Sequence, residues 1–176
     1  MNRKLNTEEI VRVSADEFKL LSKTPLVVVL DDIRSMHNIG SIFRTCDAFC
    51  IEKIFLCGIT AVPPNNEIHK SALGAEFSVE WEYFESSDMA VKQLIDDGYI
   101  VYSIEQTENS IMLNAIDVDK DRKYAIVLGN EVFGVSQTTI DLCCGTIEIP
   151  QLGTKHSLNV SVAGGLAIWE FFNKLR

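Results

Sequence analysis

The carboxyl-terminal stretch Ile147–Arg176, IEIPQLGTKHSLNVSVAGGLAIWEFFNKLR, decides the fold of this chain. It starts with a short strand, Ile147–Ile149, which Pro150 ends because proline has no N–H to donate to a neighbouring strand. The polar loop Gln151–Ser157 follows, and from Asn159 the spacing of apolar residues predicts a helix. A polar loop between a strand and a helix is a common ligand site in α/β proteins, so we expect one here.

Upstream of this stretch, short apolar runs alternate with helical patterns. The runs are rich in valine, isoleucine and leucine, which is typical of strands buried on both faces. We therefore predict an α/β protein with a mostly parallel sheet of about five or six strands, flanked by helices. The predicted strands are Pro25–Leu30, Lys53–Cys57, Val79–Tyr83, Tyr99–Ile104, Tyr124–Leu128 and Thr146–Ile149. The predicted helices are approximately Thr7–Leu21, Ile39–Phe49, Glu67–Leu73, Ser87–Ile95, Ser136–Leu142 and the segment from Asn159.

Composition excludes several classes of protein. No apolar run approaches the about 20 residues of a membrane span, and the charged start does not resemble a signal peptide, so we expect a cytoplasmic protein that does not associate with membranes. The five cysteines form no CxxC pair, which argues against a zinc or redox motif and favours buried, reduced thiols. The net charge of −9 argues against a polyanionic partner at first. However, residues 76–121 hold 12 acidic and 2 basic side chains, so another face can be neutral or basic.

Three polar loops follow predicted strands, at Asp31–Gly40, Gly129–Gly134 and Gln151–Asn159. In a parallel sheet the loops after the strands meet at one edge, so we expect these three to converge. Neither GxGxxG nor GxxxxGK[ST] occurs, which disfavours a hydride-transfer enzyme and a P-loop NTPase. Ser157 lacks a GxSxG context, which argues against a hydrolase, and the three scattered histidines predict no metal site.

The same three loops carry motifs that resemble those of a known family. Asn38–Arg44, NIGSIFR, resembles the N-x-G-x-x-x-R first motif of the SpoU (TrmH) RNA ribose methyltransferases. Leu128–Gly134, LGNEVFG, is similar to their second motif, L-G-N-E-x-x-G. Ile149–Ala163, IPQLGTKHSLNVSVA, is similar to their third, I-P-M-x-G-x-x-x-S-L-N-V-S-V-A, with Gln151 in place of methionine. The order and spacing agree, and the resemblance covers roughly residues 25–176.

The resemblance implies a fold and a reaction. The family belongs to the SPOUT class, so a trefoil knot is expected at the carboxyl terminus, and a homodimer through the helix after the first motif and the terminal helix. Residues 1–176 are expected to form a single SPOUT methyltransferase domain, with an N-terminal helical extension (1–24) and a catalytic core (25–176). The expected reaction transfers methyl from S-adenosylmethionine to a ribose 2′-hydroxyl of RNA, without a metal. Transfer RNA is the preferred substrate; ribosomal RNA, or a non-catalytic RNA-binding or assembly role, is the alternative.

Roles for individual residues follow from their places in the motifs. The catalytic residues that the resemblance implies are Arg44, Asn38, Glu131, Ser157 and Asn159. The expected cofactor-binding residues are Ile104, Glu105, Leu128, Gly129, Asn130, Gly134, Ile149, Gln151, Leu158 and Asn159. The expected substrate-binding residues are Arg34, His37, Asn38 and Arg44, with Lys53 and Lys70 as further candidates for phosphate contacts.

Each role has a structural alternative. Arg44 could pair with Asp47 or Glu52 on the surface, and Glu131, Ser157 and Asn159 could be caps of loops and helices. If Arg44 is catalytic, two roles are open: a base, or an electrostatic clamp on a phosphate and the developing alkoxide. We favour the clamp, because an arginine pKa above about 12 makes a poor proton acceptor.

Overall fold

The computed structural model describes residues 2–11 and 13–176. Its strands are β1 (Thr24–Asp31), β2 (Ile51–Cys57), β3 (Trp81–Phe84), β4 (Tyr99–Ile104), β5 (Ile111–Met112), β6 (Lys123–Leu128) and β7 (Gly145–Glu148). Its helices are α1 (Ala15–Leu20), α2 (Met36–Ala48), α3 (Asn66–Ala72), α4 (Ala75–Ser78), α5 (Ser87–Asp96), α6 (Gln137–Leu142) and α7 (Val160–Leu175). Two short 3-10 helices are η1 (Thr7–Glu9) and η2 (Leu113–Ala115).

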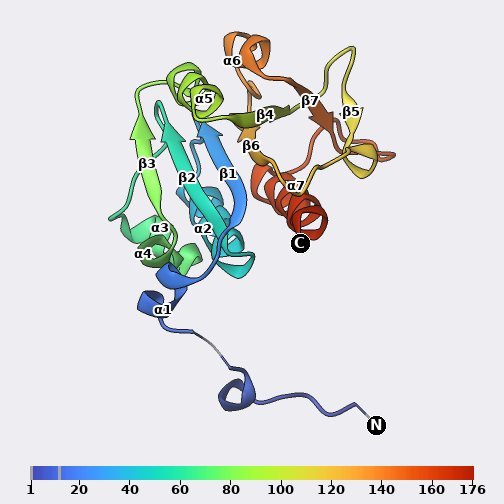
Figure 1. Ribbon diagram of the computed structural model, residues 1–176. Coiled ribbons are helices and arrows are strands. Elements are labelled where there is room, and N and C mark those ends of the chain that lie inside the picture. The colour runs from blue at the N-terminus through green and yellow to red at the C-terminus, as the bar shows by residue number, and fades with distance from the viewer. Residues whose placement is uncertain (1, 12) are drawn as a thin grey trace.

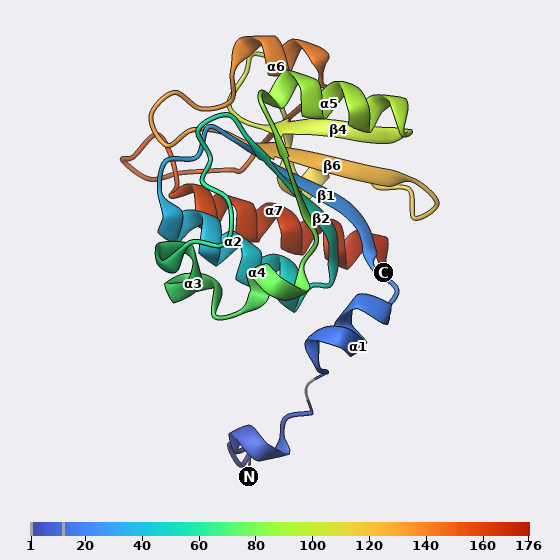
Figure 2. The ribbon, with the colours of Figure 1, turned by 90° about the vertical axis from the view of Figure 1, so that its left-hand side faces the viewer.

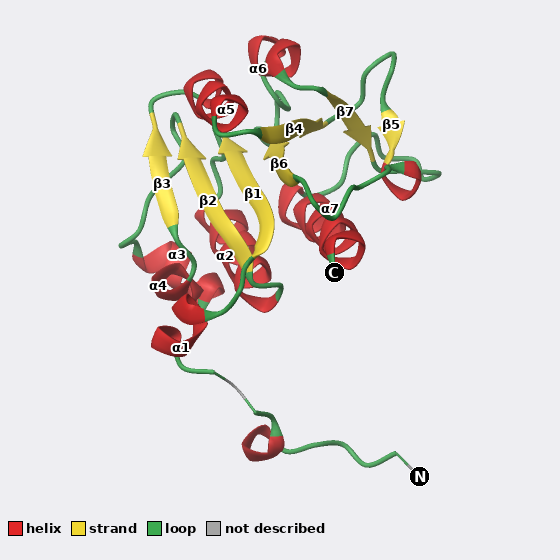
Figure 3. Cartoon of the chain, in the orientation of Figure 1, coloured by secondary structure: helices red, strands yellow, loops and turns green. Residues whose placement is uncertain are grey.

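Within these described residues the strands form one sheet in the order β3-β2-β1-β6-β4-β7-β5, and each neighbouring pair is parallel (Figure 1). The predicted α/β class is therefore confirmed. The sheet has one strand more than the six predicted, because β5 contains only two residues. Its side chains, Ile111 and Met112, are both 41% exposed, so β5 lacks the buried apolar run that identifies a strand in a sequence. Figure 3 shows β5 beside β7, at the opposite end of the sheet from β3.

Helices cover both faces of the sheet (Figure 2). Helices α5 and α6 lie on one face, and α2 and α7 lie on the other, with α3 and α4 next to α2. Strand β1 contributes side chains to the hydrophobic core on both faces of the sheet. Leu26, Val28 and Leu30 pack in the core on the α2 and α7 side. Val27 and Val29 pack in the core on the α5 side. Side chains alternate between the faces of a strand, which is why a continuous apolar run is needed here.

The predicted continuous helix Thr7–Leu21 is wrong. The described residues of this segment form η1 and then α1, which starts only at Ala15. Ser14 caps α1: its Oγ accepts the N–H of Glu17 at 3.2 Å, and its own N–H donates to the Glu17 carboxylate at 2.7 Å. A residue that caps a helix has extended backbone angles, as Ser14 does, so it cannot lie inside a helix that began earlier. The segment before α1 extends away from the sheet (Figure 1).

Helix α2 begins three residues earlier than the predicted start at Ile39. The Ser35 Oγ accepts the N–H of Asn38 at 3.3 Å and so caps the helix at Met36. The predicted polar loop Asp31–Gly40 is therefore only partly a loop, and Asn38 lies in the first turn of α2. This correction matters for the site, because a helix fixes the direction of a side chain more firmly than a loop does.

The five cysteines are free thiols, as predicted, but only Cys46 and Cys57 are fully buried. Burial raises the pKa of both thiols well above the ordinary value, and it raises the pKa of the half-buried Cys143 to about 12. Cys144 is exposed, so the expectation of buried thiols fails there.

Candidate active site

A cavity of about 640 Å³ opens at the carboxyl ends of β4, β6 and β7. Its lining comes from the loop after β4, the loop after β6, and the segment from β7 to the first turns of α7. In parallel sheets this edge holds the ligand sites, and the volume suits a small-molecule cofactor. All ten residues predicted to bind the cofactor line this cavity: Ile104, Glu105, Leu128, Gly129, Asn130, Gly134, Ile149, Gln151, Leu158 and Asn159.

The loop after β6 is closed on itself. The N–H of Asn130 donates to the Gly134 carbonyl at 3.0 Å, and the N–H of Gly134 donates back at 2.9 Å. The Asn130 Oδ1 accepts the N–H groups of Val132 and Phe133, at 2.9 and 3.1 Å. Gly134 has φ +69°, and a Cβ on Gly129 would lie 2.1 Å from the Gly134 carbonyl carbon, so both positions require glycine. The loop is therefore a fixed part of the cavity wall.

Glu105 joins the loop after β4 to the loop after β6. Its Oε2 accepts the N–H of Val135 at 3.1 Å, and its Oε1 accepts the N–H of Gln106 at 2.9 Å. The Gln106 Nε2 in turn donates to the carbonyl of His156 at 2.9 Å, in the loop after β7. These contacts hold the three cavity walls at fixed positions relative to one another.

Glu131 joins the loop after β6 to the start of α2. Its carboxylate accepts the backbone N–H groups of Arg34 and Ser35 and the Nδ2–H of Asn38, each at 3.0 Å. Partial burial acts to raise the pKa of Glu131, but these three donors favour the charged form and outweigh it. The pKa of Glu131 therefore lies below its ordinary value, and the carboxylate is ionised at neutral pH.

Asn159 completes the connection from the third loop. Its Nδ2 donates to the Asn38 Oδ1 at 3.1 Å, while its own Oδ1 caps α7 by accepting the N–H of Ser161 at 2.9 Å. Glu131, Asn38 and Asn159 thus form one hydrogen-bonded chain. The three motif segments were predicted to converge, and the structure confirms this. Asn159 is therefore both a helix cap, as its structural alternative required, and a residue of the site.

Two predicted catalytic residues, Asn38 and Arg44, lie outside the cavity lining. Asn38 is joined to the lining by its hydrogen bonds to Glu131 and Asn159. Arg44 is the one that the structure leaves apart from the cavity. It lies six residues beyond Asn38 on α2, is exposed, and is absent from the cavity lining among the described residues. The expected surface partners are engaged elsewhere. Asp47 accepts the Ser78 hydroxyl at 2.6 Å, and Glu52 accepts the Tyr99 hydroxyl at 2.6 Å. The carboxylates that the surface alternative invoked therefore do not account for Arg44.

The predicted phosphate-contacting residues divide into two groups. Arg34 and His37 lie at the start of α2, near Glu131 but outside the cavity lining. Lys53 lies near the amino end of β2, at the opposite edge of the sheet from the cavity, 3.8 Å from Glu82. The structure therefore does not support Lys53 as a phosphate contact near this site.

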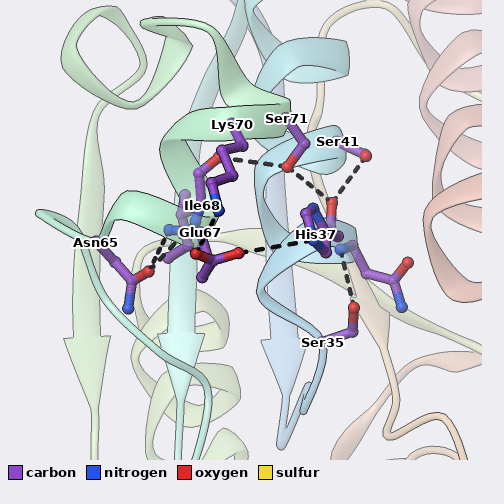
Figure 4. A network of polar contacts seen from close by, with 9 residues as sticks. Ser35, His37, Ser41, Asn65, Glu67, Ile68, Lys70 and Ser71 are labelled. Carbon is purple, nitrogen blue, oxygen red and sulfur yellow. Dashed lines mark hydrogen bonds and ion pairs between the residues drawn. The ribbon is translucent and has the colours of Figure 1, made fainter.

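His37 and Lys70 belong to a polar network between α2 and α3 (Figure 4). The Glu67 carboxylate lies 2.6 Å from the Lys70 Nζ and 3.8 Å from the His37 Nε2. Lys70 is the main cause of the lowered pKa of Glu67. The hydroxyls of Ser41 and Ser71 both donate to the His37 carbonyl, at 2.8 and 3.1 Å. Glu67 thus partly neutralises Lys70 and also lies near His37, two of the residues that the sequence offered for phosphate binding.

Several cavity residues were not predicted. Gln106, His156, Val132 and Phe133 all line the cavity, and none of them was singled out from the sequence. Val132 and Phe133 occupy the two variable positions of the second motif, so the family pattern gave no reason to select them. A usable signal was available, because an aromatic residue in a short polar loop calls for an explanation.

Two absences hold for residues 2–11 and 13–176. No helix there combines the length and the hydropathy needed to cross a membrane. No cluster of three or more histidine, cysteine, aspartate or glutamate side chains in that part of the chain is arranged to hold a metal ion.

Comparisons with known proteins agree with this geometry. A Staphylococcus epidermidis protein assigned to the TrmH family of tRNA/rRNA methyltransferases is 30% identical over 163 residues, which cover 90% of this chain and 64% of the relative. The chain thus spans less than two thirds of that relative's length. An AdoMet-bound rRNA methyltransferase from Sinorhizobium meliloti superposes with a TM-score of 0.79 at 25% identity, covering 90% of this chain and 60% of that one. A TrmH/SpoU tRNA modifying enzyme from A. aeolicus shares the fold, with a TM-score of 0.79 at 24% identity and coverage of 91% and 81%.

The model of one family matches most of the chain. Residues 25–169 match the SpoU rRNA Methylase family, and this range contains the three motif segments that meet at the cavity. The chain therefore belongs to the SpoU family of RNA methylases.

Proposed function

We propose that this chain is an S-adenosylmethionine-dependent RNA methyltransferase that modifies a ribose 2′-hydroxyl. The observation that carries the proposal is the hydrogen-bonded chain Glu131–Asn38–Asn159 beside a cavity of about 640 Å³. Glu131 fixes the Asn38 amide, and Asn38 and Asn159 then present fixed polar groups where a ribose must be held still. The cofactor supplies a methyl group bound to a cationic sulfur, so the protein needs to position the two reactants and stabilise the developing alkoxide.

The cavity suits this cofactor. Apolar side chains of Leu128, Ile149 and Leu158 line it and offer a surface for adenine, while Gly129 exposes backbone without a side chain. Gln106 and Gln151 add neutral amides that can donate and accept hydrogen bonds. A relative of known structure, the Sinorhizobium meliloti rRNA methyltransferase, was crystallised with AdoMet.

We propose transfer RNA as the substrate in preference to ribosomal RNA, and a cytoplasmic location. The names of the TrmH-family relatives include both tRNA and rRNA, so an experiment has to decide between these two substrates. The net charge of −9 implies modest RNA affinity that depends steeply on salt and on a few basic residues.

We propose that two copies of the chain form the working enzyme. Val162, Leu166 and Trp169 are large apolar side chains spaced along one side of α7, and all three are exposed. Helix α7 packs against α2 in the same layer, and α2 carries the exposed Arg44. If this layer faces a second copy, Arg44 reaches the interface and can complete the site of the partner instead of its own. This arrangement accounts for an arginine that lies outside its own cavity.

Isothermal calorimetry and methyl transfer test the proposal. Wild-type protein should bind S-adenosylmethionine and transfer tritium from the labelled cofactor into bulk tRNA or rRNA. Asn38→Ala should keep cofactor binding, because Asn38 lies outside the cavity lining. It should lose most of the methyl transfer, because the amide proposed to hold the ribose is removed. Failure to bind the cofactor would instead favour a non-catalytic RNA-binding role. The observation that supports this second role is that Arg44 lies outside the cavity of its own chain.

A further inference from the structure

The closed loop after β6 presents two apolar side chains to solvent at the rim of the cavity. Phe133 is 85% exposed and Val132 is 64% exposed, although both line the cavity. A phenylalanine so exposed forgoes the free energy that burying its ring would give. Its neighbour Glu131 is tied to α2 at the proposed ribose site. The loop therefore places an unburied aromatic ring beside the groups that are to hold the substrate.

The backbone that carries the ring is held in place before any ligand binds. The Asn130 side chain accepts the N–H of Phe133 at 3.1 Å and donates from Nδ2 to the carbonyl of Asp32 at 2.7 Å. The reciprocal Asn130–Gly134 backbone hydrogen bonds close the loop beneath it. The backbone that carries Phe133 is therefore pre-organised, and little further order has to be imposed on it when a ligand packs against the ring.

The surroundings select the kind of ligand. A cofactor adenine belongs among the apolar side chains inside the cavity, whereas most of the Phe133 ring faces solvent. An RNA that brings its ribose to Asn38 reaches the same loop, because Glu131 in that loop accepts the Asn38 amide. Aromatic side chains stack on the face of any base, and this contact needs no positive charge. A chain with a net charge of −9 gains RNA affinity by such a contact without further lysines or arginines.

We propose that Phe133 stacks on a nucleobase of the RNA, at or next to the nucleotide whose ribose enters the site. This inference rests on the proposed function. It makes Phe133 a substrate-positioning residue that acts through the base, distinct from the polar groups that hold the ribose. It also explains why an aromatic ring is kept at the surface of this loop.

Three variants test this role: Phe133→Ala, Phe133→Tyr and, as a control outside the cavity lining, Met89→Ala. The RNA fraction that wild type methylates is titrated at saturating S-adenosylmethionine. Phe133→Ala should raise the KM for RNA about five- to 150-fold, with cofactor affinity unchanged. Phe133→Tyr should stay within about threefold of wild type, since it keeps the stacking ring. Met89→Ala removes exposed apolar surface from α5, outside the cavity lining, and should change the KM by less than about twofold.

A binding measurement decides the inference independently of catalysis. Fluorescence anisotropy of a labelled single-stranded oligoadenylate is measured with S-adenosylhomocysteine present. Phe133→Ala should weaken binding, and Phe133→Tyr and Met89→Ala should not. If wild type methylates neither tRNA nor rRNA, the proposed function fails, and this titration still tests the stacking role.

Four results would overturn the inference. Phe133→Ala could bind the oligoadenylate as wild type does, or Phe133→Leu could restore binding as well as tyrosine, which would show an apolar contact without stacking. Phe133→Ala could weaken S-adenosylmethionine binding in calorimetry, which would place the ring on the cofactor. It could also turn a dimer into a monomer in sedimentation velocity, which would place the ring at a protein interface.

Discussion

At the scale of single residues, Glu131 connects the site to the fold. Its carboxylate accepts three hydrogen bonds, from the N–H groups of Arg34 and Ser35 just before α2 and from the Asn38 amide in its first turn. We read it as a positioning residue: it fixes the Asn38 amide, whose oxygen then accepts the Asn159 amide. Removing the charge of Glu131 should weaken the hydrogen-bonded chain Glu131–Asn38–Asn159 while leaving the cavity wall in place.

Glu131→Gln should lower the free energy of unfolding by roughly 1 kcal/mol at pH 7, because charge-assisted hydrogen bonds become neutral ones at an exposed site. The pKa of Glu131 is lowered in the folded protein, so its stabilising contribution is complete above the unfolded pKa, about 4.3. That contribution is lost as the pH falls through the still lower folded pKa. Urea unfolding of both proteins at pH 7, 4 and 3 should show the difference shrink with acidity. A difference that stayed constant down to pH 3 would contradict this role.

The sequence predicted residues of the cavity well, whereas Arg44 lies outside the lining and its catalytic role stays a prediction. The ten predicted cofactor residues lie together because each sits at the end of a strand of one parallel sheet or in the segment that follows it, and strand order constrains where such segments go. Their role in binding the cofactor stays a prediction. Arg44 lies within a helix, and a motif does not say which molecule faces that side of the helix. Phe133 was missed because the second motif leaves its position open.

At the scale of elements, the apolar runs located the longer strands within one or two residues, because each must fill two core layers. Boundaries set by local capping were less predictable. Ser35 starts α2 early, and Ser14 divides the amino-terminal segment. The short helix α4 and the two-residue strand β5 are too brief to show a period.

The contact between α2 and α3 depends on Gly40. A Cβ at this position would lie 2.2 Å from the Ser71 Oγ and 2.3 Å from the Ile68 carbonyl oxygen. Gly40→Ala should therefore lower the free energy of unfolding by about 1–3 kcal/mol, even though alanine favours a helix. Thermal or urea unfolding measures this loss.

A second variant identifies the cause of that loss. Gly40→Ala combined with Ser71→Ala removes the hydroxyl but leaves the Ile68 carbonyl in place, so most of the loss should persist. If Gly40→Ala proved neutral or stabilising, the close packing of α2 on α3 described here would be wrong.

At the scale of the whole molecule, the open question is what covers the layer formed by α2 and α7. The dimer, the carboxyl-terminal trefoil knot and the division into residues 1–24 and 25–176 stay predictions. A knot has no signature in periodicity or charge, because it is a property of the path of the entire chain. Likewise, in the structure of a single subunit an interface is visible only as a group of exposed apolar side chains.

The proposed dimer can be broken at α7. Leu166→Glu places a charge in the exposed apolar strip and should convert the dimer into a monomer in sedimentation velocity, with loss of methyl transfer. Met89→Glu is the matched control, since Met89 is an exposed apolar residue on α5, on the other face of the sheet. It should leave the oligomeric state unchanged. A wild-type monomer, or a Leu166→Glu dimer, would contradict the interface.

A mixing experiment tests whether Arg44 serves the partner's site. Arg44→Ala and Asn38→Ala should each reduce transfer by about 100- to 1,000-fold as homodimers. If Arg44 acts across the interface, a mixed dimer has one intact site, so an equal mixture should recover about a quarter of wild-type activity. If Arg44 acts within its own subunit, the mixture should stay inactive.

The position of the transferred methyl group tests the central claim most directly. RNA labelled with tritium from S-adenosylmethionine by the wild-type protein is hydrolysed with alkali, which cleaves after every nucleotide that has a free 2′-hydroxyl. We predict that the label is recovered in alkali-resistant dinucleotides, and that Arg44→Ala lowers this signal in parallel with total transfer. Label recovered in mononucleotides would place the methyl group on a base and would contradict the account.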